Sequence, residues 1–423
     1  MIDITKLYTG SDSQGDFIRY GQKGTHSAIK EGMTPKSAAE RRPVTVWNCT
    51  RSCNLSCVHC YTDSEKKSYA GELTTEEAKV MLKDLAEFKI PALLISGGEP
   101  LMRKDLFELV HYAKNLGIRP TLSTNGTLIT KDVAQKIKDA GFTYVGISLD
   151  GIGEINDKFR GEKGAFKKAM DGFRNCVQAG QRVGLRMTLT KQNYRDLHRI
   201  FDFIEKEEIQ RACFYHLVYS GRGDSISKED LSYQETRQAM DIILERTDDF
   251  SKRGLNKEIL TVDNHVDGVY LYMKLKQESS KRAEEVLRLL EWNGGGAFSS
   301  GVGIGNIDFL GNVHPDQFWM HHSFGSIRER KFSEIWMDTS EPLMKGLKDK
   351  KKYIKGRCSK CKWLGACGGS LRVRAELVYD DPWAPEPACY LTDEEIGLTE
   401  EHKKELADKG EIYTPPSCLT KTA

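Results

Sequence analysis

Short apolar runs alternate with amphipathic stretches through the first two thirds of this 423-residue chain. From Pro43 onward, six runs rich in β-branched and other apolar residues have the length and composition of strands. They cover residues 44–48, 92–96, 119–123, 144–149, 183–189 and 213–218. Amphipathic stretches of helical length follow them at 75–88, 104–116, 131–140, 164–179, 195–207 and 232–250.

The first of these stretches shows why they are expected to be helices. Its apolar residues recur at intervals of three and four, which places them on one helical face: Ala78, Met81, Leu82, Leu85 and Phe88. Six strand-helix units predict a parallel sheet with helices outside it. In barrels of this kind the chemistry lies at the carboxyl ends of the strands.

The rest of the chain divides by composition. Two glycine-rich runs, N-G-G-G at 293–296 and S-S-G-V-G-I-G-N at 299–306, mark a boundary. A long charged helix is expected near 279–291. The predicted organisation is an N-terminal arm (1–42), a barrel (43–254), a connecting helical segment (255–292), a second domain (293–395) and a C-terminal tail (396–423).

Charge and hydropathy exclude some classes of partner. Lysine and arginine total 63 against 61 acidic residues, so the net charge of +2 does not predict binding to nucleic acid. No apolar run reaches 18 residues, and the first residues lack the pattern of a signal peptide, so a cytoplasmic protein without a membrane partner is expected. The eleven cysteines are mostly clustered, which favours metal binding in a reducing compartment over disulfides.

The first cysteine cluster follows the first predicted strand. Cys53, Cys57 and Cys60 have a C-x3-C-x2-C spacing. Three thiolates at this spacing can hold three irons of a 4Fe-4S cluster and leave the fourth iron without a protein ligand. A structural zinc site that recruits His59 is the alternative, but zinc usually takes four ligands in two closer pairs.

Polar residues end the next three predicted strands: S-G-G-E-P at 96–100, S-T-N-G at 123–126 and S-L-D-G at 148–151. Gly97 and Gly98 would let the backbone approach a ligand, and Glu99 would accept hydrogen bonds from an ammonium group. Asn-Gly and Asp-Gly are also ordinary turn formers. Arg160 either pairs with a carboxylate or lies in a solvated loop.

A second cysteine cluster lies near the C-terminus. Cys358, Cys361 and Cys367 have a C-x2-C-x5-C spacing, and Cys389 follows 21 residues later. Four thiolates can close either a zinc site or a fully ligated 4Fe-4S cluster. The spacing leaves both metals open.

The three-cysteine motif followed by S-G-G-E-P resembles the signature of the radical S-adenosylmethionine (radical SAM) superfamily, and the second cluster resembles its SPASM/twitch-like auxiliary domain. The resemblance implies an α/β fold: a partial (β/α)6 TIM-like barrel with a C-terminal auxiliary domain. It also implies two 4Fe-4S clusters, with S-adenosylmethionine chelated at the open iron of the first. One auxiliary cluster is expected, because the region of the usual other one lacks cysteines. The implied cofactor-binding residues are Gly97, Gly98, Glu99, Ser123, Asn125, Ser148, Asp150 and Arg160.

Longer motifs, among them F-Y-H-L-V-Y-S-G-R-G and N-I-D-F-L-G-N-V-H-P-D-Q-F-W, resemble radical SAM enzymes that trim the side chains of modified siroheme. This implies an iron-tetrapyrrole substrate, didecarboxysiroheme, whose acetate groups are removed through a 5′-deoxyadenosyl radical to give iron-coproporphyrin III in anaerobic heme biosynthesis. It also implies a one-electron donor such as flavodoxin or ferredoxin. Removal of propionate groups in dioxo-heme synthesis and peptide maturation are the alternatives. Candidate catalytic residues are His216, Arg222 and His314, for each of which a structural role stays open.

Overall fold

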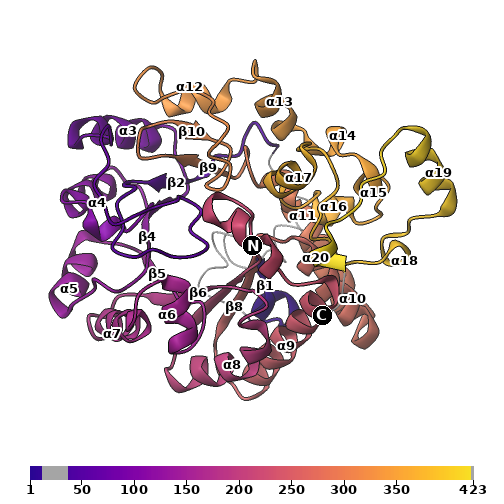
Figure 1. The fold of residues 1–423 in the computed structure, drawn as a ribbon, viewed down its shortest axis with the longest axis horizontal. Coiled ribbons are helices and arrows are strands. Elements are labelled where there is room, and N and C mark those ends of the chain that lie inside the picture. The colour runs from indigo at the N-terminus through magenta and orange to yellow at the C-terminus, as the bar shows by residue number, and fades with distance from the viewer. Residues whose placement is uncertain (12–36, 421–423) are drawn as a thin grey trace.

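One curved sheet organises the molecule, of which the computed structural model describes residues 1–11 and 37–420 (Figure 1). Within these residues, ten strands pair in the order β1-β8-β7-β6-β5-β4-β3-β2-β9-β10. The strands from β2 to β8 follow one another in sequence and are all parallel. They are β2 (Val44–Asn48), β3 (Leu93–Ser96), β4 (Pro120–Thr124), β5 (Tyr144–Ser148), β6 (Val183–Thr188), β7 (Arg211–Tyr215) and β8 (Glu258–Val262).

Helices cover the outer face of this sheet (Figure 1). They are α3 (Thr75–Glu87), α4 (Leu106–Asn115), α5 (Lys131–Ala140), α6 (Glu154–Arg160), α7 (Ala165–Gln178), α8 (Leu197–Lys206) and α9 (Tyr233–Lys252). A capping box between Thr74 and Glu77 starts α3. The predicted apolar face of α3 is buried at Ala78, Met81, Leu82 and Leu85. Helix α6, between Gly153 and Gly161, was not predicted.

The sheet differs from the prediction at its sixth and seventh parallel strands. The sixth was expected at 213–218, but the observed strand, β7, ends at Tyr215. The N–H of His216 still donates to the carbonyl oxygen of Val262 (3.0 Å), and after this bond the chain no longer pairs with β8. Strand β8 is buried along its whole length and lies inside the predicted connecting segment. The parallel sheet therefore continues past residue 254.

The described part of the predicted N-terminal arm belongs to the folded core. Strand β1 (Ile2–Asp3) pairs antiparallel with β8, and the π-helix η1 (Thr5–Thr9) follows it. Ile2, Ile4 and Leu7 are buried. Residues 1–11 are thus not an arm, and residues 12–36 of the predicted arm lie outside the described residues.

At the other end of the sheet, β9 (Ile304–Ile307) lies parallel to β2, and β10 (Val313–His314) pairs antiparallel with β9. Helices α10 (Val266–Glu278) and α11 (Ser280–Asn293) connect β8 to this region. The C-terminal helices are α12 (Phe332–Met337), α13 (Pro342–Lys348), α14 (Lys350–Tyr353), α15 (Gly356–Ser359), α16 (Leu364–Cys367), α17 (Arg372–Tyr379), α18 (Asp393–Ile396), α19 (Glu400–Asp408) and α20 (Ser417–Thr420). Short 3-10 helices are η2 (Pro100–Met102), η3 (Tyr194–Asp196), η4 (Gly221–Glu229) and η5 (Gly295–Phe298).

Among the described residues, no helix combines the length and the apolar character needed to cross a lipid bilayer.

Candidate functional site

A cavity lies at the carboxyl ends of the parallel strands, where the fold was expected to carry its chemistry. Every strand from β2 to β8 contributes to its wall, either directly or through the loop that follows. The lining residues that bear on the chemistry are Cys53, Cys57, Cys60, Gly97, Gly98, Ser123, Asn125, Ser148, Asp150, Arg160, Arg186, Tyr215, His216, Asp263, Gln317 and Phe318.

The three cysteines of the first cluster all face this cavity, and none forms a disulfide. Each sulfur accepts a hydrogen bond: Cys53 from the Leu55 N–H (3.4 Å), Cys60 from the Ser64 N–H (3.4 Å) and Cys57 from the Arg160 guanidinium (3.8 Å). Burial raises the pKa of Cys53 to about 12, so a thiolate there needs a compensating cation. Three thiols with N–H donors to their sulfurs fit an iron-sulfur cluster with three protein ligands.

Glycines hold the cysteine loop against the sheet. A Cβ atom on Gly98 would lie 2.2 Å from the carbonyl oxygen of Ser52, and one on Gly97 would lie 2.3 Å from that of Thr50. Neither position has room for a side chain. The expected approach of these glycines to a ligand stays a prediction, but the structure gives a further reason for them, which is backbone packing against the loop.

Glu99 does not line the cavity as the sequence led us to expect. It is fully buried, and its carboxylate accepts hydrogen bonds from the Thr124 hydroxyl (2.7 Å) and the Asn125 N–H (2.9 Å). Burial raises the pKa of this carboxyl group. Glu99 therefore joins the ends of β3 and β4, and the geometry does not support its predicted contact with an ammonium group.

Asp150 and Arg160 form a buried ion pair at the cavity wall. Arg160 reaches this position because α6 ends there, so it is not a solvated loop residue. Burial acts to raise the pKa of Asp150, but the charges of Arg160 and His59 outweigh it and hold this pKa below its ordinary value. His59, the alternative zinc ligand, lies 3.3 Å from Asp150 through Nε2. Both partners of the ion pair line the cavity, and their binding of a cofactor stays a prediction.

Of the three predicted catalytic residues, His216 is the one placed in the cavity wall. Its Nε2 lies 2.8 Å from Asp267 on α10, which fixes the ring. His216 is buried, and its pKa is raised because Asp267 outweighs the opposing effect of burial. This residue can hold or donate a proton inside the cavity.

Arg222 and His314 are placed elsewhere, which departs from the prediction. Arg222 donates to the carbonyl oxygen of Cys57 (2.9 Å) and pairs with Asp63 (2.7 Å), so it clamps the cysteine loop. His314 lies between Asp308 (3.2 Å) and the carbonyl oxygen of His322 (2.7 Å). Neither side chain is part of the cavity wall.

Two cavity residues were missed from the sequence. Arg186 on β6 donates to the Tyr215 hydroxyl, and the described residues offer it no carboxylate partner. The sequence feature that could have indicated Arg186 is its position as a single arginine inside the apolar run V-G-L-R-M-T-L. Asp263 directly follows β8 with a φ of +67°, and its Oδ2 has no hydrogen-bond partner among the described residues. Its signal was an aspartate at the end of I-L-T-V.

The four cysteines of the second cluster converge on one small cavity, which Val266, Trp363 and Leu391 also line. All four are free thiols: Cys358, Cys361, Cys367 and Cys389. The glycine-rich run before β9 packs behind them, because a Cβ atom on Gly295 would lie 2.4 Å from the carbonyl oxygen of Ala366. This donor set fits a cluster with four protein ligands.

Comparisons with known proteins agree with this geometry. The family model of the radical SAM superfamily matches residues 47–204. The Fe-coproporphyrin III synthase of Methanosarcina barkeri is 54% identical over 95% of this chain and 100% of its own length. The pre-heme d1 synthase of Dinoroseobacter shibae is 43% identical over 84% of this chain and 88% of its own.

A solved structure gives the same fold. Streptococcus suis SuiB bound to its precursor peptide superposes with a TM-score of 0.63 and 17% identity, over 89% of this chain and 80% of that one. The predicted fold class is therefore confirmed. The chain has its cavity at the strand ends and is 54% identical to the Methanosarcina barkeri protein over 95% of its length, and it belongs to the radical SAM superfamily.

Proposed function

We propose that this chain is an Fe-coproporphyrin III synthase, which removes the acetate side chains of 12,18-didecarboxysiroheme to give iron-coproporphyrin III. The observation that carries the proposal is the 54% identity to a protein of that name over 95% of this chain. The pre-heme d1 synthase is less similar, at 43%. This difference favours removal of acetate over removal of propionate groups.

The cysteines would hold two 4Fe-4S clusters. Cys53, Cys57 and Cys60 would bind the first, with S-adenosylmethionine at its fourth iron, and the four C-terminal cysteines would bind the auxiliary cluster. When bound, the first cluster and S-adenosylmethionine would supply the electron and the 5′-deoxyadenosyl radical that start the reaction. A flavodoxin or ferredoxin would be the electron donor.

Residues of the cavity wall would position the cofactor and the substrate. Ser123, Asn125 and Ser148, together with the backbone of Gly97 and Gly98, supply polar groups for the methionine and ribose parts of S-adenosylmethionine. Asp150 holds Arg160 in place, so that its guanidinium group lies beside the sulfur of Cys57. These are the residues that we assign to cofactor binding.

An iron tetrapyrrole is a flat apolar disc with several carboxylates, so its pocket needs cations and aromatic side chains. Arg186 supplies a half-buried cation, and Tyr215 and Phe318 supply aromatic surface. His216 would hold a proton near the reacting side chain, because its Nε2 is already fixed by Asp267. The apolar residues of the wall, which include Leu94, Met187 and Leu217, would exclude water from the radical.

The test is an anaerobic assay. Reconstituted protein, a reductant, S-adenosylmethionine and didecarboxysiroheme should yield 5′-deoxyadenosine and iron-coproporphyrin III, and Cys57→Ala should yield neither. An iron content of about eight per chain would match two 4Fe-4S clusters. Deoxyadenosine without a change in the tetrapyrrole would refute the substrate, and the absence of both products from the iron-loaded protein would refute the activity.

A further inference from the structure

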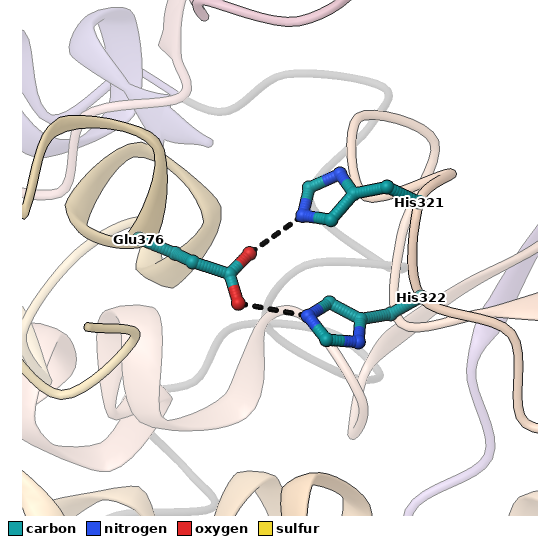
Figure 2. Close-up of side chains that lie close together, drawn as sticks. All are labelled: His321, His322 and Glu376. Carbon is teal, nitrogen blue, oxygen red and sulfur yellow. Dashed lines mark hydrogen bonds and ion pairs between the residues drawn. The ribbon is translucent and has the colours of Figure 1, made fainter. Parts of the chain in front are cut away.

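Two histidines and a glutamate meet outside both cysteine sites (Figure 2). His321 and His322 lie in the turn after β10, and Glu376 lies on α17. The Nε2 atom of His321 is 2.6 Å from one carboxylate oxygen of Glu376, and that of His322 is 2.8 Å from the other. The three ligand atoms lie within 4.8 Å of one another.

The surrounding structure holds this group in place. The indole N–H of the buried Trp319 donates to the carboxylate of Glu376. The backbone of His322 is fixed twice, because its N–H donates to Trp319 O (3.2 Å) and its carbonyl oxygen contacts His314 Nδ1 (2.7 Å). The side chains of His321 and His322 are 47% and 40% exposed, so an ion from solvent can reach them.

We propose that His321, His322 and Glu376 bind one divalent transition-metal ion of the zinc class. Two imidazoles and one carboxylate are the protein ligands of open zinc sites, in which the fourth position takes water. Metal-ligand distances of about 2.0 to 2.2 Å place nitrogen and oxygen ligands roughly 3.3 Å apart around a tetrahedral ion. The two observed nitrogen-oxygen separations must therefore widen by roughly 0.5 to 0.7 Å.

The exposed imidazoles supply this movement, and Trp319 keeps the carboxylate oriented as outer-shell partners of metal ligands do. The ion would fasten the turn at residues 319–322 to α17. Gln317 and Phe318, which precede this turn, line the cavity at the strand ends, so the ion would stabilise that part of its wall.

The experiment uses anaerobically reconstituted protein, because iron-sulfur clusters then occupy the thiols that would otherwise bind zinc. After treatment with a chelator and desalting, the protein is titrated with zinc chloride by calorimetry. We expect one zinc equivalent per chain. Glu376→Gln should weaken its binding by about tenfold or more, and the double variant His321→Ala/His322→Ala should abolish it. His198→Ala, which removes an exposed histidine on α8, is the matched control and should bind like the original protein.

Iron content and the midpoint of thermal unfolding, measured for each variant, show whether it is folded. If a folded double variant retains the zinc equivalent, zinc binds elsewhere and the proposal is wrong. The proposal is equally wrong if the original protein binds no zinc. A zinc-edge anomalous difference peak between the two imidazoles in a crystal of the zinc-loaded protein would support it, and its absence there would overturn it.

Discussion

The guanidinium group of Arg186 on β6 donates hydrogen bonds of 2.9 and 2.6 Å to the hydroxyl of Tyr215 on β7. Both side chains line the cavity at the strand ends, and the described residues provide no carboxylate to neutralise the arginine. Arg186 is half-buried, and removing even part of a cation from water without a paired anion costs free energy. The lack of a carboxylate partner for Arg186 is therefore best explained by a ligand that brings a carboxylate. S-adenosylmethionine and a carboxylated tetrapyrrole both do so.

Arg186→Gln should raise the KM for one of these two ligands by about tenfold to a hundredfold, because a hydrogen bond to a charged group contributes about 1.5 to 3 kcal/mol. Steady-state kinetics, with the concentration of each ligand varied in turn, would identify which of the two ligands Arg186 binds. Arg199→Gln, which removes an exposed arginine on α8, should leave both values unchanged. Unchanged KM values in the Arg186 variant would contradict a role in binding.

Gly98→Ala should prevent the first cluster from assembling. The new Cβ atom would lie 2.2 Å from the carbonyl oxygen of Ser52, and backbone cannot rotate away as a side chain can. We expect the iron content after reconstitution to fall from about eight to about four per chain. Gly365→Ala is the control, because its nearest neighbour is the Glu291 side chain at 3.7 Å. Full iron loading of the Gly98 variant would refute this prediction.

The strands from β2 to β7 could be predicted because each is a short apolar run next to an amphipathic helix. Strand β8 could not, because residues 266–272 of the helix after it, α10, are all buried and therefore show no amphipathic pattern. Strand β1 could not be predicted either, since its two residues pair with a strand more than 250 positions away. Such pairing leaves no local periodicity in the sequence.

In the site, too, features that are local in the sequence could be predicted and features that depend on distant segments could not. Cys53, Cys57 and Cys60 are close in sequence, so their spacing alone predicts a common ligand. The roles of Arg186 and Asp263 depend on which strands are neighbours, which spacing does not reveal. Conversely, residues just after a strand were expected in the cavity wall, but at Arg222 the chain turns back to the cysteine loop.

Arg222 provides a test that separates positioning from catalysis. It holds the carbonyl oxygens of Cys57 (2.9 Å) and Ser64 (3.0 Å), so Arg222→Gln should loosen the cysteine loop. We expect a lower iron content and a smaller yield of 5′-deoxyadenosine, but an unchanged KM for the tetrapyrrole. Arg222→Lys should partly restore the iron.

A fully iron-loaded Arg222→Gln protein that cleaves S-adenosylmethionine but leaves the tetrapyrrole unchanged would instead support the catalytic role expected from the sequence.

Asp263 should make the stability of the protein depend on pH. Burial raises its pKa from 3.8 to about 6 in the folded state. Between these values the folded protein keeps a proton that the unfolded chain has lost, so the free energy of unfolding falls as pH rises through this window. Above about pH 6 this decrease in the free energy of unfolding is complete, and it amounts to at most about 3 kcal/mol.

Asp263→Asn removes this titration, and asparagine tolerates the positive φ of +67° at this position. The variant should therefore be more stable than the original protein at about pH 7.5, and this advantage should shrink at about pH 5. Anaerobic urea unfolding of both proteins at the two pH values measures the difference. Because both proteins share every other titrating group, an advantage that is equal at the two pH values would show that Asp263 does not titrate in this window.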